Sequence, residues 1–264
     1  MLGTGSALVT HCFNTCFVVK LSGGEYFLTD AGGGNGILRQ FELAKIDWTK
    51  LRYMFVTHGH TDHVLGVIWV IRKIATMLNQ GKYTGKFLVY CHDTVKNMLQ
   101  IMTELTLKKK DLAQVGQGIL INEVKDGDKV EFADVNLTAF DICSPKAKQF
   151  GYELRFADGT RLCCLGDEPY NEHDKAYAQG ADWLLAEAFC KYEDRDVFKP
   201  YEKNHSTCKE AGEIAAALKV KNLVLYHTED KTLSCRKAEY TAEAAKYYGG
   251  NNFVPDDLEV IELK

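Results

Sequence analysis

The stretch FVTHGHTDHVLG at positions 55–66 holds three of the chain's 8 histidines together with an aspartate. These residues are His58, His60, Asp62 and His63. Residues two apart on an extended chain point to the same side, so His58 and His60 can direct two imidazoles at one point. Asp62 and His63 follow where the chain enters a helix, and they can serve a neighbouring point. Imidazole and carboxylate groups bind zinc, iron and manganese, so the stretch predicts a metal site.

The alternative is that these four side chains only cap a helix and hydrogen-bond within a turn. A single histidine at such a junction would fit that interpretation. Here the four polar residues lie between two apolar runs, RYMFV and VLGVIWVI. Burying so many polar groups without a metal partner would cost several kcal/mol, which favours metal binding.

Further ligands are expected at the ends of other strands. Four residues that can bind metal each close an apolar run, namely Cys143, Asp167, Glu187 and His227. One acidic residue at a strand end is usually just part of a turn. Four metal-capable residues in equivalent places favour a shared site, to which distant parts of the chain contribute.

The elements that must position these residues are short strands and two clear helices. A helix is predicted from Asp62 to Leu78, because its apolar residues keep a three-four spacing. Another follows positions 205–207, where Thr207 and Glu210 have capping-box spacing. Strands and helices in this order predict an α/β protein whose helices cover sheet faces. The predicted strands lie at 16–21, 25–30, 53–57, 86–91, 135–142, 152–156, 161–166, 182–187 and 222–227.

Length and composition favour one domain spanning residues 1–264. Hydrophobic residues make up 46% of the chain and charged residues 26%, and only 4 prolines occur. The net charge of -4 does not suggest a nucleic-acid-binding protein, and the basic run LKKKD at 107–111 is typical of a solvated helix end. The opening MLGTGSA leaves room for a short preceding segment.

The 9 cysteines form an odd, scattered set, which is typical of reduced thiols in the cytoplasm. No signal peptide and no apolar run of transmembrane length is recognisable, so no membrane association is expected. The run VIWVIRKIATML at 67–78 is compatible with a buried core face and equally with a homodimer face.

With these motifs in place, the chain resembles the metallo-β-lactamase superfamily, and within it the ribonuclease Z-like branch. The resemblance runs nearly end to end, and THGHTDH is its most specific motif. The matching segments are LGTGSA at 2–7, LTDAGGG at 28–34, THGHTDH at 57–63, LGDEP at 165–169, AEA at 186–188, HST at 205–207 and LYHTE at 225–229.

The resemblance implies a four-layer αβ/βα sandwich, with two mixed sheets and helices outside. It also implies two divalent metal ions, with zinc favoured and manganese or iron as alternatives. His58 and His60 would bind the first ion. Asp62, His63 and His227 would bind the second, and Asp167 would bridge the two. Asp30 would be the structural aspartate of the first motif.

Two residues depart from the family pattern. Cys143 stands where the family places a histidine as the third ligand of the first ion. A thiolate binds zinc well, so Cys143 is expected to be a ligand, with a small buried residue as the alternative. Ala186 stands where ribonuclease Z has a histidine before the glutamate, which changes the proton-transfer network.

The expected activity is hydrolysis of a small phosphodiester by a hydroxide held between two metals. Asp62 and Asp167 would hold the metals and orient the hydroxide, and His205, steered by Glu187, would protonate the leaving oxygen. The arm that grips tRNA in long-form ribonuclease Z is absent between Asp167 and Glu187, so tRNA is not expected as the substrate.

Three alternatives remain open. The first is hydrolysis of a lactone or thioester by the same type of centre, because fold does not fix substrate. The second is ribonuclease Z activity proper. The third, from a different class, is a non-catalytic metal-binding or sensing protein.

Overall fold

The computed structural model describes residues 1–263, in which two β-sheets face each other. The first sheet has the strand order β1-β2-β3-β4-β5. Its β1–β2 pair is antiparallel and the other pairs are parallel, so the sheet is mixed. Its strands are β1 (Phe17–Lys20), β2 (Tyr26–Thr29), β3 (Leu51–Val56), β4 (Phe87–Cys91) and β5 (Ile119–Glu123).

The second sheet has the strand order β12-β11-β10-β9-β8-β7-β6 and is also mixed. The strands β9 to β12 run parallel to one another, and β6 to β9 pair as an antiparallel meander. Its strands are β6 (Lys129–Phe132), β7 (Val135–Asp141), β8 (Phe150–Phe156), β9 (Arg161–Cys164), β10 (Trp183–Glu187), β11 (Asn222–Tyr226) and β12 (Asn251–Phe253).

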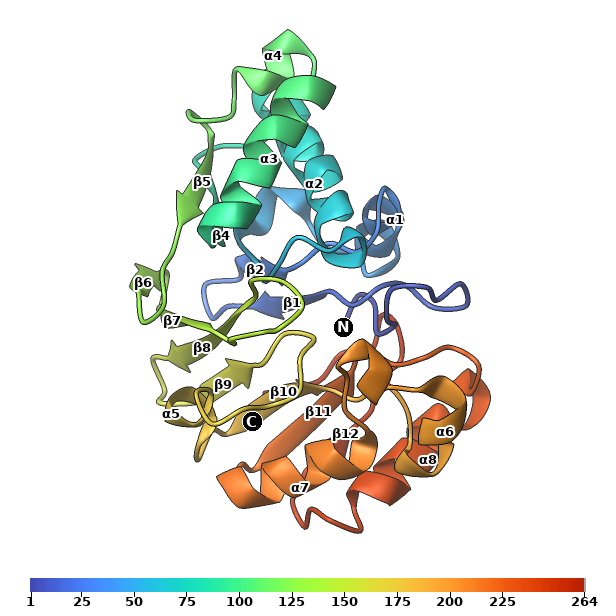
Figure 1. Ribbon diagram of the computed structural model, residues 1–264. Coiled ribbons are helices and arrows are strands. Elements are labelled where there is room, and N and C mark those ends of the chain that lie inside the picture. The colour runs from blue at the N-terminus through green and yellow to red at the C-terminus, as the bar shows by residue number, and fades with distance from the viewer. Residues whose placement is uncertain (264) are drawn as a thin grey trace.

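Helices cover the outer face of each sheet, which gives four layers (Figure 1). The helices over the first sheet are α1 (Gly36–Leu43), α2 (Thr61–Asn79), α3 (Asp93–Thr106) and α4 (Lys109–Leu112). Those in the second half are α5 (Lys175–Ala178), α6 (Arg195–Phe198), α7 (Cys208–Leu218) and α8 (Leu233–Ala244). Single 3₁₀ turns lie at Trp48–Lys50, Tyr192–Asp194 and Tyr201–Lys203.

Alternation along the strands produces three hydrophobic layers between the four layers of structure. In β3, Met54 and Val56 pack toward the helices of the first half, whereas Phe55 between them packs into the layer between the sheets. In β10, Leu184 belongs to the layer beneath α7 and α8, and Leu185 faces the other sheet. Since neighbouring side chains of a strand point to opposite faces, both faces of each sheet are buried.

All nine predicted strands and both predicted helices are confirmed, within a residue or two at their ends. Three strands were not predicted, namely β5, β6 and β12. Each lies at the edge of its sheet and pairs on one side only, so its sequence carries a weaker apolar pattern. The apolar residues of α2 pack against the first sheet, and the run at 67–78 is therefore core.

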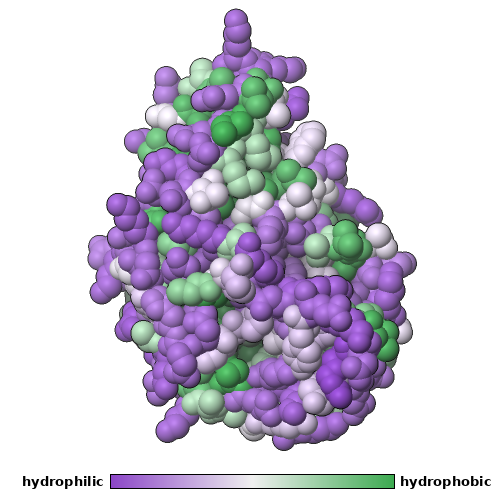
Figure 2. Space-filling model, viewed as in Figure 1, coloured by the Kyte–Doolittle hydropathy of each residue, from purple (hydrophilic) through white to green (hydrophobic). Residues whose placement is uncertain are grey.

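The loops that matter for chemistry follow β3 in the first sheet and β9, β10 and β11 in the second. Because β9, β10 and β11 are parallel neighbours, their carboxyl ends meet at one edge. The face seen in Figure 2 is mostly hydrophilic, with small separate hydrophobic areas. Within residues 1–263, no helix has both the length and the apolar character needed to cross a membrane.

Candidate metal centre

The first group of metal-capable atoms lies between β3 and α2. His58 follows β3 after one intervening residue, and His60 occupies the N-cap position of α2 with extended backbone angles. His58 Nε2 lies 3.0 Å from His60 Nδ1. The extended backbone thus brings the two imidazoles together, as the two-residue spacing predicts.

The second group combines the first turn of α2 with the end of β11. Asp62 Oδ2 lies 3.3 Å from His63 Nε2 and 3.4 Å from His227 Nε2. His227 follows β11 with a positive φ of 59°, a left-handed conformation that turns the chain at the end of the strand. Side chains separated by more than half the chain length thus come together at one place in the structure.

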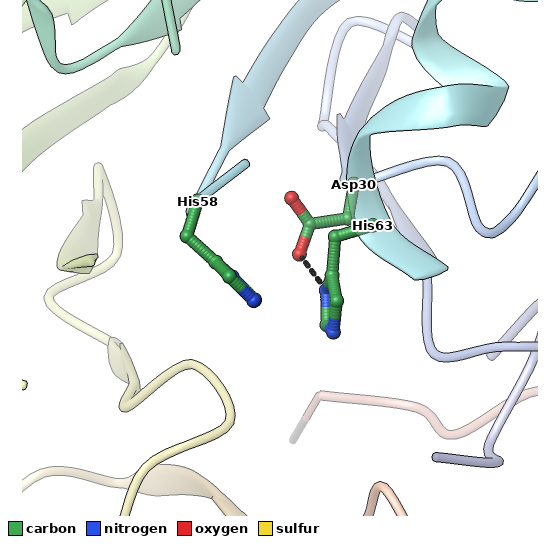
Figure 3. A group of neighbouring side chains, drawn as sticks. All are labelled: Asp30, His58 and His63. Atoms are coloured by element: carbon green, nitrogen blue, oxygen red, sulfur yellow. Dashed lines mark hydrogen bonds and ion pairs between the residues drawn. The ribbon is translucent and has the colours of Figure 1, made fainter. Parts of the chain in front are cut away.

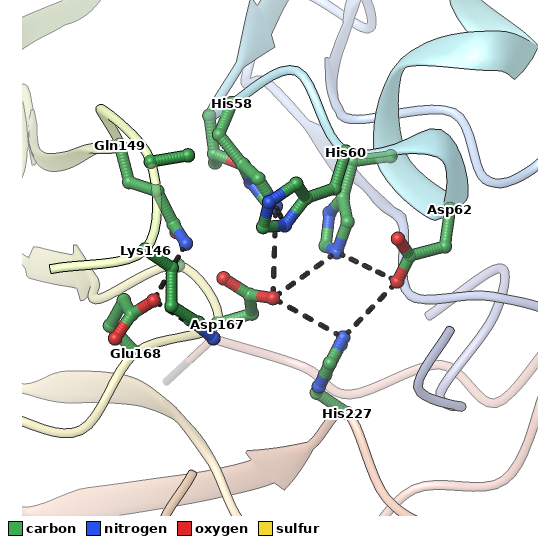
Figure 4. A network of polar contacts seen from close by, with 12 residues as sticks. His58, His60, Asp62, Lys146, Gln149, Asp167, Glu168 and His227 are labelled. Carbon is green, nitrogen blue, oxygen red and sulfur yellow. Dashed lines mark hydrogen bonds and ion pairs between the residues drawn. The ribbon is translucent and has the colours of Figure 1, made fainter. Parts of the chain in front are cut away.

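Asp167 lies between the two groups (Figure 4). Its Oδ2 atom is 3.7 Å from His58 Nε2, 3.8 Å from His63 Nε2 and 3.6 Å from His227 Nε2. One carboxylate oxygen is therefore nearly equidistant from imidazoles of both groups. That is the placement expected of a residue that bridges two ions.

The donor set fits divalent metal ions. Ligands bound at roughly 2.1 Å in a tetrahedron lie about 3.4 Å apart, close to the spacings within the second group. Two buried atoms, Asp167 Oδ1 and His63 Nε2, have no hydrogen-bond partner among the described residues. Polar atoms without partners are costly in a protein interior, and metal coordination would satisfy them. Two of the groupings that could hold an ion are His58–His60–Asp167 and Asp62–His63–His227.

Asp30 fixes the orientation of the second group from behind (Figure 3). Its Oδ2 lies 2.8 Å from His63 Nδ1 and accepts a hydrogen bond from Thr57 Oγ1 at 2.7 Å. Its Oδ1 accepts from the Thr57 amide at 2.8 Å. With Nδ1 paired to a carboxylate, the His63 ring directs Nε2 toward Asp62 in the site, a common support for metal-binding histidines.

The protonation states of His58 and Asp167 suit ligands directly. Burial lowers the pKa of His58 well below its usual value, so its imidazole is neutral and its lone pair available. Burial alone would raise the pKa of Asp167, but favourable electrostatic interactions with the surrounding side chains, including the Lys146 ammonium, outweigh it and lower that pKa. Asp167 is therefore ionised at neutral pH. Burial alone would lower the pKa of His63, but Asp30 and Asp62 outweigh it and raise that pKa well above its usual value, so metal binding at His63 would displace a proton.

A candidate proton donor lies beside this centre. His205 Nδ1 is 3.5 Å from Glu187 Oε2, and a ring nitrogen of His205 lies within 4.8 Å of ligand atoms of Asp167 and His227. Glu187 itself accepts a hydrogen bond from the Ser206 amide. The end of β10 and the start of α7 thus bring together the pair that the resemblance implies.

Phe189 is a neighbour of His205 that sequence reasoning missed. Its ring stacks on the imidazole, with centroids 5.2 Å apart and planes 10° from parallel. The side chain is 7% exposed. An aromatic residue just after a buried strand is indistinguishable from ordinary core in the sequence, so no signal marked it.

Cys143 corrects an expectation, because the structure does not bring it to the centre. Its side chain is exposed, and its Sγ contacts the Asp141 carbonyl oxygen at 3.7 Å. Among residues 1–263, none of the groups able to hold an ion includes it. The chain turns at Cys143 with a φ of 58°, and desolvation together with the charges of Asp141, Asp174 and Asp126 raises the pKa of its thiol. The alternative of a small buried residue is therefore wrong, and in this structure the thiol lies outside the candidate ligand groups.

A polar network around Glu168 lies next to the first group. The sequence did not predict a role for Glu168. The Glu168 carboxylate is 3% exposed and follows Asp167 directly. It accepts hydrogen bonds from Ser144 Oγ at 2.8 Å, from Gln149 Nε2 at 3.0 Å and from Asn204 Nδ2. Lys146 Nζ lies 2.9 Å from the same carboxylate. Its position beside Asp167 in LGDEP was the only available signal.

Comparison with known proteins agrees with the family resemblance seen in the sequence. A family model described as the beta-lactamase superfamily domain matches residues 25–228. A protein named ribonuclease Z from Thermococcus onnurineus (strain NA1) is 25% identical over 311 residues, covering 100% of this chain and 94% of the relative.

Two solved structures are similar over nearly the whole chain. The metallo-beta-lactamase fold protein YhfI from Bacillus subtilis has a TM-score of 0.76 and 17% identity, covering 97% of this chain and 95% of its own. Human tRNase Z, short form, has a TM-score of 0.75 and 20% identity, covering 100% and 98%. Both likenesses confirm the four-layer fold predicted from the sequence.

Proposed function

The chain belongs to the beta-lactamase superfamily, and on that premise we propose that this metal-dependent hydrolase is a phosphodiesterase. The observation that carries the proposal is the position of Asp167. One of its oxygens lies 3.6–3.8 Å from imidazoles of both ligand groups, with the Glu187–His205 pair alongside. A centre for two cations next to a proton donor suits cleavage of an ester bond to phosphorus.

The residues that would hold the ions follow from the two groups. His58, His60 and Asp167 would hold one ion. Asp62, His63 and His227 would hold the other, together with Asp167. Imidazole and carboxylate donors favour zinc, and manganese or iron are the alternatives. The chemistry that two bound divalent cations supply is Lewis-acid polarisation of a phosphoryl oxygen and acidification of water.

The protein's own residues would manage orientation and proton transfer. Asp30 would orient the His63 ring, and the ionised Asp167 would set the spacing of the two groups. His205 would donate a proton to the leaving oxygen. Glu187 would hold the ring and stabilise its charged form, while Phe189 keeps the ring plane fixed.

Processing of tRNA is the second candidate, and the relatives favour it. The Thermococcus relative bears the name ribonuclease Z, and this chain covers 98% of the human short-form tRNase Z structure. Against it stand the acidic net charge of -4 and the absence of an arm between Asp167 and Glu187. The alignment with the archaeal relative spans 311 positions for 264 residues, so that relative carries segments that this chain lacks.

One experiment separates the candidates. The metal-reconstituted protein is tested on bis-p-nitrophenyl phosphate, cyclic nucleotides, a lactone and a precursor tRNA, and the metal content of the same sample is measured. We expect metal-dependent turnover of the small phosphodiesters. Turnover of the lactone alone, or none at full metal content, contradicts the proposal. Efficient cleavage of the precursor tRNA at physiological salt establishes the second candidate.

A further inference from the structure

The segment between β7 and β8, residues 142–149, approaches the first ligand group without providing a ligand. Three of its side chains converge instead on the Glu168 carboxylate: Lys146 and Gln149, seen in Figure 4, and Ser144. Asn204, next to His205, contributes a fourth donor. Three of these groups contact Oε1 and Asn204 contacts Oε2, so both oxygens of Glu168 have partners and the carboxylate is held in place beside Asp167.

Lys146 is the charged member of this network. Its Nζ lies 2.9 Å from Glu168 Oε1, and its charge also acts on Asp167, the central carboxylate of the site. The lysine side chain is 25% exposed, whereas that of Glu168 is only 2% exposed. Among the described residues, Glu168 is the one carboxylate in direct contact with the ammonium. Since an ammonium has three donors and one is directed at Glu168, two N–H groups remain for other acceptors.

Other lysines near the site are engaged elsewhere. Lys148 pairs with Asp93 at 2.8 Å and lies over the ring of Phe150. Lys203 donates to the Phe198 carbonyl oxygen and lies over the ring of Phe189. Lys146 therefore differs from them, because a buried carboxylate next to a candidate metal ligand anchors its charge.

We propose that Lys146 is the anion-binding residue of this centre, where its ammonium binds a non-bridging oxygen of the substrate phosphate. The proposal rests on the proposed function, since it names the residue that recognises the phosphate group of a phosphodiester. Charge-assisted hydrogen bonds from an anchored ammonium to phosphate are stronger than neutral ones, and the anchor limits the entropy lost on binding. The chain's negative net charge is thus offset where the substrate binds.

The test uses metal-reconstituted protein and inorganic phosphate as the probe, with binding measured by calorimetry. Lys146→Met removes the charge and keeps the length, and Lys146→Arg keeps the charge. Lys148→Met, in the same segment, is the matched control. We expect Lys146→Met to weaken phosphate binding about 10- to 100-fold, the effect of losing a hydrogen bond to a charged group. The arginine and control variants should stay within about threefold of the wild type, since neither removes that charge from the site.

Metal content and thermal melting are recorded for every variant. Retained metal and folding together with weakened phosphate binding support the proposal. Unchanged phosphate binding in Lys146→Met overturns it, as does an equal loss in Lys148→Met or a loss of metal in Lys146→Met. The calorimetry does not depend on turnover. If no phosphodiester is hydrolysed but Lys146→Met still weakens phosphate binding, the proposed function fails while the anion site stands.

Discussion

At the scale of single residues, His205 is held from two directions. The Glu187 carboxylate lies 3.5 Å from its Nδ1, and the Phe189 ring lies parallel to the imidazole at 5.2 Å. A carboxylate on one side and a stacked ring on the other restrict the rotation of the imidazole. This fixed orientation suits the role of proton donor that we propose for His205.

His205→Ala should therefore affect substrates according to their leaving groups. An aryl ester leaves as a stabilised phenolate, whereas an alkoxide leaves poorly without a proton. We expect turnover of an alkyl phosphodiester to fall by roughly 10²–10⁴-fold, while the aryl ester is mostly spared. His11→Ala, which removes an exposed histidine paired with Asp230, is the matched control and should change neither rate. Equal losses on both substrates would assign His205 to binding or structure.

Cys143→Ser tests the correction of the ligand set. The thiol is exposed and contacts a backbone carbonyl outside the two ligand groups, so metal stoichiometry and affinity should be unchanged. His60→Ala serves as the positive control and should lose metal from the first group. The measurement is elemental analysis after reconstitution and dialysis. A drop in metal content for Cys143→Ser would mean that the thiol reaches the centre in solution.

At the scale of elements, the site depends on how closely α2 packs against the loop after β2. The Ala31 amide donates to the His63 carbonyl oxygen at 3.1 Å, and the Gly66 amide donates to the Gly32 carbonyl oxygen at 2.8 Å. A Cβ atom at Gly66 would lie 1.8 Å from the Ala31 carbonyl oxygen. Only glycine permits this approach, which brings Asp30 within reach of His63.

Gly66→Ala should accordingly damage stability and metal binding together. The added methyl group meets backbone, which cannot swing away, so α2 must shift and carry Asp62 and His63 with it. We expect a loss of about 1–3 kcal/mol in the free energy of unfolding and weaker metal binding. Gly34→Ala, where the added Cβ would meet nothing within 4 Å, is the matched control. Denaturant unfolding with metal titration gives both quantities, and equal behaviour of the two variants would contradict this account.

At the scale of the whole molecule, the centre joins the two halves of the sandwich. His58, His60, Asp62 and His63 follow β3 in the first sheet, and Asp167 and His227 follow strands of the second. The buried layer between the sheets holds the halves together. The candidate ligands from the two halves lie within 4 Å of one another. Ions bound there would link both halves directly.

Removal of metal should therefore lower global stability. A ligand that binds only the folded state stabilises it by RT ln(1 + [L]/Kd), about 4 kcal/mol at a thousandfold excess over Kd. We expect the melting temperature to fall on chelation and to recover when zinc is restored. His63→Ala should show little of this metal-dependent stabilisation. A melting temperature that changes neither with chelator nor with zinc would argue against a metal centre at this position.

The sequence by itself determined much of the scaffold. Apolar alternation marked the strands and three-four spacing marked α2, because both patterns are local and follow directly from backbone geometry. The spacing of His58, His60, Asp62 and His63 likewise predicted a cluster of metal ligands, because all four residues lie in one short stretch. The distant Asp167 and His227 were identified from their strand ends and from the family resemblance.

Only the tertiary structure decided which residues distant in sequence lie at the candidate metal centre. Cys143 closes an apolar run as Asp167 does, yet a left-handed turn carries its thiol away from the centre. Phe189 and Lys146 carry no signal of their own, because stacking and anchoring depend on partners that are distant in sequence. The direction of a side chain at the end of a strand is set by the turn that follows and by long-range packing, and neither is encoded in local spacing.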